Sequence, residues 1–230
     1  SEPREGQLTF FNCAAMMNHL YRYTVRQELL SGPFRFQPEK PAAFFPGTFD
    51  PFSVGHKQIV QEIRARGFEV YLAVDEFSWS KKTLPKLLRR KIVSISVADQ
   101  WDTYLFPDDI PVNIAMPDDL ARLQAMLPGR DLYLVAGSDV IQHASAYQSR
   151  EPGSAAEYNH VIFCRDGSAD AKELSTIIRG KLLLLSLPPF YETVSSTRIR
   201  ASVDQNLDIS MLVAPVVQTY IYECGLYVRS

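Results

Sequence analysis

Short apolar runs alternate with segments of helical spacing along most of the chain. The runs 132–136 and 182–185 are apolar at every position, a pattern typical of strands that are buried on both faces. The segments between such runs carry apolar residues every three or four positions, as on one face of a helix. These patterns predict strands over 42–45, 69–74, 112–114, 132–136, 161–163 and 182–185. They predict helices over 56–63, 86–98, 118–126 and 171–178, a short helix from Ser138, and one or two helices within 210–227.

This alternation favours an α/β fold. We expect a Rossmann-like, doubly wound parallel sheet of about five to six strands with helices on both faces. Such sheets collect ligands at the carboxyl ends of their strands. The domain is expected to span residues 42–230, and residues 1–41 are expected to form an N-terminal helical arm and a proline-containing linker. A helix packed on the core is favoured over an oligomerising arm.

Composition narrows the function classes. The 230 residues include 24 basic and 26 acidic side chains, so the formal net charge of −2 gives no support to a nucleic-acid or membrane-surface binder. No run has the length of a membrane span, and the beginning lacks the pattern of a secretory signal. The three cysteines lie far apart, without the spacing of a zinc site or a disulfide framework. A cytoplasmic protein is therefore expected, and the chain could be part of a longer one because it begins with Ser1.

The decapeptide 47–56, Gly-Thr-Phe-Asp-Pro-Phe-Ser-Val-Gly-His, joins the first predicted strand to the first helix of the domain. Backbone N–H groups at a helix start attract phosphate, and Gly55 would let a nucleotide approach the backbone. Gly47 allows a tight turn out of the sheet, and His56 could donate a hydrogen bond to a phosphate oxygen as charge builds there. An ordinary strand-to-helix loop capped by Ser53 is the alternative.

Two later strands end at polar residues. The run 132–136 leads to Gly137 and Asp139, and this carboxylate could accept from ribose hydroxyls or lie at a helix start. The run 182–185 leads to Ser195-Ser196-Thr197 and then Arg200, which together predict a second anion cradle. Lys82 and the pair Arg89-Arg90 add positive charge after the second strand, although solvated surface side chains are the default explanation of such runs.

Together these motifs resemble the nucleotidylyltransferase superfamily, whose signatures are (His/Thr)-x-Gly-His and Ile-Ser-Ser-Thr-x-Ile/Val-Arg. Their order is most similar to the nicotinate and nicotinamide mononucleotide adenylyltransferases, over about residues 42–228. The resemblance implies transfer of AMP from ATP to a phosphomonoester, with release of pyrophosphate and with Mg²⁺ bridging the phosphates. It implies catalytic roles for His56, Ser53, Lys82 and Arg200. It implies nucleotide-binding roles for Gly47, Thr48, Phe49, Gly55, Gly137, Asp139, Ser195, Ser196, Thr197 and Arg90, with Arg89 as the alternative to Arg90.

The acceptor is expected to be nicotinate or nicotinamide mononucleotide. Ser53 stands where nicotinate mononucleotide enzymes usually carry His, and 113–117 replaces their Ser-Tyr-Thr-like segment. A cytidylyltransferase and a phosphopantetheine-type adenylyltransferase therefore stay open as alternatives. A nucleotide-binding regulatory module with reduced catalysis is the alternative of another class. The expected partners are small nucleotides and phosphomonoesters, with neither nucleic acid nor membrane, and a homo-oligomer or a further attached domain is left open.

Overall fold

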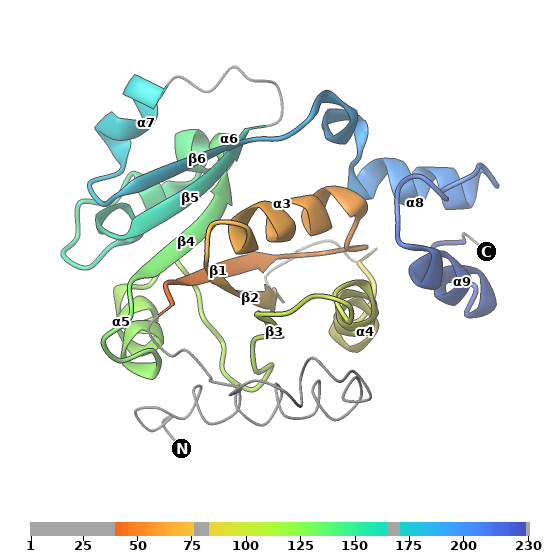
Figure 1. Cartoon of the computed structure of the whole chain (residues 1–230), viewed down its shortest axis with the longest axis horizontal. Helices are drawn as coiled ribbons and strands as arrows, with labels where there is room; N and C mark the ends of the chain where they lie inside the picture. The colour runs from red at the N-terminus through yellow and green to blue at the C-terminus, as the bar shows by residue number, and fades with distance from the viewer. Residues whose placement is uncertain (1–39, 76–82, 165–170, 229–230) are drawn as a thin grey trace, which may run out of the picture.

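A six-stranded parallel sheet forms the centre of the molecule (Figure 1). The computed structural model describes residues 40–75, 83–164 and 171–228. The strands are β1 (Ala42–Gly47), β2 (Glu69–Val74), β3 (Thr103–Leu105), β4 (Leu132–Gly137), β5 (Asn159–Cys164) and β6 (Leu182–Ser186). Their order in the sheet is β3-β2-β1-β4-β5-β6, and every neighbouring pair is parallel. The chain therefore reverses its direction of winding between β1 and β4, where doubly wound sheets bind their ligands.

Helices cover both faces of this sheet. They are α3 (Val54–Arg64), α4 (Lys86–Ser96), α5 (Pro117–Met126), α6 (Ser138–His143), α7 (Ala171–Ile177), α8 (Ser196–Asp204) and α9 (Pro215–Glu223). Short 3₁₀ turns lie at Ser145–Tyr147, Ala155–Glu157 and Pro189–Thr193. None of the helices in the described part of the chain is long and apolar enough to cross a membrane.

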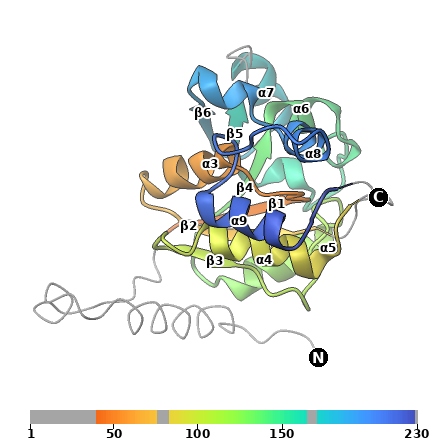
Figure 2. The same cartoon turned by 90° about the vertical axis from the view of Figure 1, so that its right-hand side faces the viewer.

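Alternate residues of β1 separate two apolar cores. Ala43 and Phe45 pack with apolar side chains of α3, α4, α8 and α9 on one face. Ala42 and Phe44 pack with side chains of α5, α6 and α7 on the other. Figure 2 shows α4 and α9 lying side by side, in agreement with their contacts. The predicted Rossmann-like, doubly wound fold is confirmed, and the predicted arm within 1–41 lies outside the described residues except for its last two positions.

One predicted strand was wrong. Residues 112–114 form no strand, and the strand beside β2 is 103–105 instead. Asn113 donates its backbone N–H to the Asp119 carboxylate at 2.8 Å and accepts from the Met116 N–H at 2.9 Å, so its backbone is used in a turn. Pro111 lacks the N–H that a ladder needs at its own position. The helix expected within 210–227 is the single helix α9.

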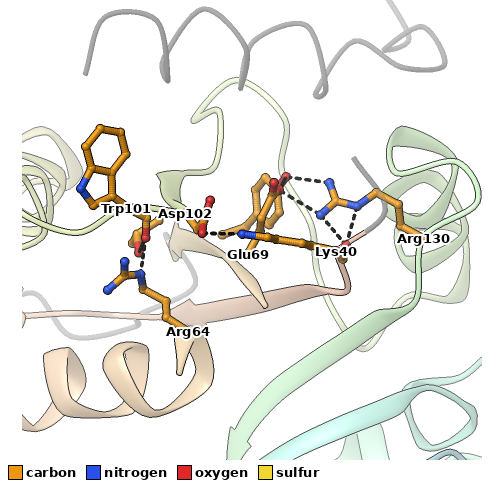
Figure 3. Close-up of polar contacts among 8 residues, drawn as sticks. Lys40, Arg64, Glu69, Trp101, Asp102 and Arg130 are labelled. Atoms are coloured by element: carbon orange, nitrogen blue, oxygen red, sulfur yellow. Dashed lines mark hydrogen bonds and ion pairs between the residues drawn. The ribbon is translucent and has the colours of Figure 1, made fainter. Parts of the chain in front are cut away.

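At the amino ends of the strands, an ionic network is closed off from solvent (Figure 3). The Arg130 and Glu69 side chains are 2% and 1% exposed, and Arg130 Nη2 lies 2.9 Å from Glu69 Oε2. Arg130 also donates from Nε and Nη2 to the Lys40 carbonyl, at 2.8 and 2.7 Å. The Tyr71 hydroxyl donates to Glu69 at 2.7 Å, and burial followed by the Glu69 charge raises the pKa of Tyr71 above its usual value. The buried charges of Arg130 and Glu69 thus compensate each other, and removing either one would leave the other uncompensated.

Candidate active site

A cleft of about 1400 Å³ opens at the opposite, carboxyl edge of the sheet. It lies over the switch point, because Gly47 at the end of β1 and Gly137 at the end of β4 both line it. Its other lining residues come from several separate segments of the chain. Among them are Thr48, Phe49, Asp50, His56, Asp75, Thr83, Leu84, Asn113, Phe163, Ser196, Thr197, Arg200 and Tyr227.

The turn after β1 depends on a glycine at position 47. A Cβ there would lie 2.8 Å from the Phe49 ring, closer than real contacts allow, so only glycine fits. Phe49 itself has a φ of 49° and is buried, with its ring edge-on to Phe45 and Phe52. Gly55 is also buried, and a Cβ there would meet Ser53 Oγ at 3.4 Å and Val194 at 3.7 Å, both ordinary contact distances. The close packing of aromatic and apolar side chains therefore shapes this turn.

The side chain of His56 is oriented by Ser53. Ser53 is the N-cap of α3, and its backbone N–H donates to His56 Nδ1 at 3.0 Å. Because a backbone N–H can only donate, Nδ1 must accept, and the proton of the neutral ring lies on Nε2. The ring also stacks on Phe52, with centroids 5.2 Å apart. Ser53 is 3% exposed and is not among the residues that line the cleft, but it is bonded to His56, which does line it.

The serine-rich start of α8 is bonded directly to the turn after β1. Ser195 is the helix N-cap, accepting from the Arg198 N–H at 3.1 Å. Ser196 donates its hydroxyl to the Pro51 carbonyl at 2.9 Å, and Arg200 donates to the Asp50 carbonyl at 2.7 Å. The two predicted anion cradles thus form one wall of the cleft, although they lie about 145 positions apart in the sequence.

The remaining predicted residues are divided between the cleft and its surroundings. Gly137 lines the cleft against the ring of Phe163, whereas Asp139 is exposed and is not among the lining residues. Arg90 lines a smaller adjoining cavity of about 160 Å³ and donates to the Phe106 carbonyl at 2.6 Å. Arg89 is buried beneath the turn after β1. Lys82 lies outside the described residues.

Sequence reasoning missed the pair formed by Tyr227 and Asp50. The Tyr227 hydroxyl donates to Asp50 Oδ1 at 2.6 Å, and Tyr227 also lines the cleft. Burial, followed by this hydrogen bond and the carboxylate charge, raises the pKa of Tyr227 well above its usual value. Asp50 lies inside the decapeptide, but no spacing rule pairs it with a residue 177 positions later.

The described residues offer no protein-built metal site. No group of three or more His, Cys, Asp or Glu side chains in this part of the chain is arranged to hold a metal ion. The cleft instead presents two helix starts, hydroxyl groups and the guanidinium of Arg200, which suit phosphate oxygens.

Solved structures share this architecture. A Plasmodium falciparum nicotinic acid mononucleotide adenylyltransferase complexed with NaAD is similar, with a TM-score of 0.66 over 82% of this chain and 98% of that one. At 18% identity, this likeness shows the fold.

Curated relatives match at the level of sequence. A probable nicotinate-nucleotide adenylyltransferase of Dehalococcoides mccartyi is 26% identical over 200 residues, covering 80% of this chain and 95% of the relative. A probable nicotinate-nucleotide adenylyltransferase of Tropheryma whipplei is 25% identical over 197 residues, covering 79% and 96%. The family model described as cytidylyltransferase-like matches residues 44–202, which contain both anion cradles. Because this match spans well over half of the sequence, the chain belongs to the cytidylyltransferase-like family, as its motifs predict.

Proposed function

We propose that this protein transfers AMP from ATP to a pyridine mononucleotide and releases pyrophosphate, with nicotinate mononucleotide as the preferred acceptor. The observation that carries the proposal is that the turn 47–56 is hydrogen-bonded to the start of α8, so that the two segments form one wall of the switch-point cleft. This wall combines two helix N-termini with His56 and Arg200, which is the chemistry that a triphosphate requires. The curated relatives named for nicotinate-nucleotide adenylyl transfer support the choice of acceptor.

In this reaction the protein acts by positioning and by charge stabilisation. The acceptor phosphate attacks the α-phosphorus of ATP, and pyrophosphate leaves from the opposite side. His56 donates from Nε2 to an oxygen that gains charge in the transition state, because Ser53 fixes Nδ1 as an acceptor. Ser196, Thr197 and Arg200 hold the β- and γ-phosphates. No covalent intermediate with the enzyme is required.

The proposal includes Mg²⁺ bound through the nucleotide. The described residues supply hydroxyl, imidazole and guanidinium groups around the cleft and no cluster of carboxylates, which fits an ion held mainly by phosphate oxygens and water. Bound in that way, Mg²⁺ neutralises charge on the polyphosphate. Asp75, which lines the cleft, is a candidate to meet its water shell.

The remaining parts of the proposal concern context. We infer a cytoplasmic enzyme of small nucleotides, without a nucleic-acid partner, with residues 42–230 as the catalytic domain and 1–41 as an appended arm. Lys82 and Arg90 are proposed to bring extra positive charge to the phosphates, and Asp139 to contact the nucleoside or the acceptor.

A panel of substrates tests the reaction. The protein is incubated with ATP or CTP, Mg²⁺, and nicotinate mononucleotide, nicotinamide mononucleotide or phosphopantetheine, while pyrophosphate release is followed. Multiple turnovers with ATP and nicotinate mononucleotide are expected. Turnover only with CTP would overturn the adenylyl assignment, and turnover only with phosphopantetheine would overturn the acceptor.

A regulatory role is the second candidate, because Ser53 contributes a hydroxyl where the related enzymes carry a histidine. Calorimetric binding of ATP without pyrophosphate release for any acceptor would favour it. Multiple-turnover activity would exclude it.

A further inference from the structure

Arg89 is a buried cation beneath the candidate site. It lies on α4, is 4% exposed, and shares the inward face of that helix with Ile92 and Val93. An arginine among such apolar residues is costly to bury unless its donors are satisfied. Its guanidinium therefore needs acceptors from the neighbouring loops.

The acceptors are three backbone carbonyl groups from three segments around the cleft. Nε donates to the Leu84 carbonyl at 2.7 Å, and Nη1 donates to the Thr48 and Asp75 carbonyls, both at 2.8 Å. Thr48, Asp75 and Leu84 all line the cleft. One side chain thus holds the turn after β1, the end of β2 and the segment before α4 in a fixed relation.

In the described part of the chain, Arg89 is held by carbonyl groups and forms no direct ion pair with a carboxylate. No Asp or Glu oxygen of the described residues lies within 4.0 Å of its guanidinium, whereas Arg130, equally buried, pairs with Glu69 at 2.9 Å. Carbonyl groups satisfy its hydrogen bonds but leave its net charge. Burial and Asp50 raise the pKa of Tyr227, and the charges of Arg200 and Arg89 oppose that rise, so the field of Arg89 reaches a residue that lines the cleft.

We propose that Arg89 is a positioning residue that sets the geometry of the polyphosphate wall and supplies it with fixed positive charge. It makes no contact with substrate, because it is buried. It acts through the Thr48 carbonyl on the turn that leads to His56, and through its field on the phosphates. The catalytic part of this inference rests on the proposed adenylyl transfer, and the structural part does not.

The variants are chosen to separate shape from charge. Arg89→Lys keeps the charge but loses the branched guanidinium group that reaches three carbonyls. Arg89→Met loses both the charge and the guanidinium group. Arg130→Lys is the matched control, because it also removes a buried guanidinium group and keeps a cation, here beside Glu69. This position lies at the amino edge of the sheet. All assays use temperatures well below the melting point of each variant.

Hydrogen exchange by mass spectrometry tests the positioning without any assumption about the reaction. Both Arg89 variants should raise exchange in peptides covering 47–50, 75 and 83–84, and Arg130→Lys should raise it near 40–41 and 69–71 instead. Unchanged exchange around the cleft in both Arg89 variants would overturn the positioning role, whether or not the protein transfers AMP.

Steady-state kinetics test the link to catalysis. Arg89→Lys should lower kcat about tenfold with little change in KM for ATP, because the charge stays and the geometry loosens. Arg89→Met should lower kcat/KM about a hundredfold and also raise KM for ATP, an effect that mere loss of folded protein would not produce. An unchanged KM in Arg89→Met, or an equal loss of kcat in Arg130→Lys, would overturn the electrostatic role.

Discussion

The two edges of the sheet use buried arginine in different ways. At the amino edge, Arg130 is paired with Glu69, and both side chains are buried (Figure 3). At the carboxyl edge, Arg89 and Arg200 donate to backbone carbonyls, and no carboxylate of the described residues pairs with either guanidinium. A cleft of about 1400 Å³ opens above them. Direct ion pairing therefore marks the amino edge, whereas the arginines of the carboxyl edge are held by carbonyl groups beside a cleft that Asp50, Asp75 and Asp204 also line.

The largest effect is expected at the carboxyl edge, from His56→Ala. Loss of the Nε2 donor should lower kcat by about 10²–10³, the usual cost of removing one donor to a developing oxyanion. The free energy of unfolding should fall by about 1–3 kcal/mol, since the capping interaction with Ser53 and the ring contacts with Phe52 and Phe49 are lost. Pyrophosphate release and urea unfolding measure the two quantities. A rate like that of the wild type would remove His56 from the mechanism.

The reverse outcome is expected at the amino edge, from Arg130→Met. This change leaves Glu69 buried without its cation and should cost about 3–5 kcal/mol of unfolding free energy. Turnover per folded molecule should stay near the wild-type value, because Arg130 lies away from the cleft. The double variant Arg130→Met/Glu69→Gln is the control and should recover part of the stability. A loss of kcat in the folded variant would contradict the division between the two edges.

A buried histidine near the amino end of β5 makes the stability depend on pH. His160 is 0% exposed, donates from Nδ1 to the Tyr158 carbonyl, and accepts at Nε2 from the Tyr147 hydroxyl. Burial lowers the pKa of His160 to about 4, partly opposed by the bond to Tyr158. The neutral ring is thus favoured in the folded state, and its contribution is complete above the unfolded pKa of about 6.5. It is lost as the pH falls from there toward 4, by about 3 kcal/mol in all.

Urea unfolding between pH 7 and pH 4 checks this dependence. His160→Gln keeps a donor and an acceptor but cannot titrate, so its stability should fall less over the same range. Equal slopes for the two proteins would show that His160 does not cause the loss. Both proteins carry the same carboxylates, so any contribution of these groups to the pH dependence cancels in the comparison.

The fold could be predicted from the sequence further than the site. The apolar runs and helical segments identify the sheet because local periodicity reports burial directly. The run 112–114 was misleading because Val-Asn-Ile has strand composition. The segment that pairs with β2 is instead 103–105, which follows Asp102 in a left-handed conformation with a φ of 56°. Such pairing depends on contacts that no short window contains.

The motifs identify the residues of the cleft but not how they act. Ser53 and His56 stand in the predicted turn, yet the direction of their hydrogen bond follows only from the coordinates. The ambiguity between Arg89 and Arg90 could have been reduced by helical spacing, because Arg89 falls on the stripe of Ile92, Val93 and Ser96. That spacing predicts a buried Arg89, but it does not predict which carbonyls the guanidinium reaches.

The smallest effect is expected from Tyr227→Phe, which tests how firmly the carboxyl edge is held. The variant keeps the ring and removes the hydroxyl that donates to Asp50 at 2.6 Å, leaving a buried carboxylate with one donor fewer. A hydrogen bond to a charged group contributes about 1.5–3 kcal/mol, and part of this loss is expected to be offset by the nearby charges of Arg200 and Arg89. The turn that carries Asp50 also holds the carbonyl bound by Arg200, so kcat should fall by about three- to tenfold, with KM for ATP changing less. Tyr222→Phe, on the exposed surface of α9, is the matched control, and an equal effect from both changes would mean that the Tyr227 hydroxyl does not hold the turn.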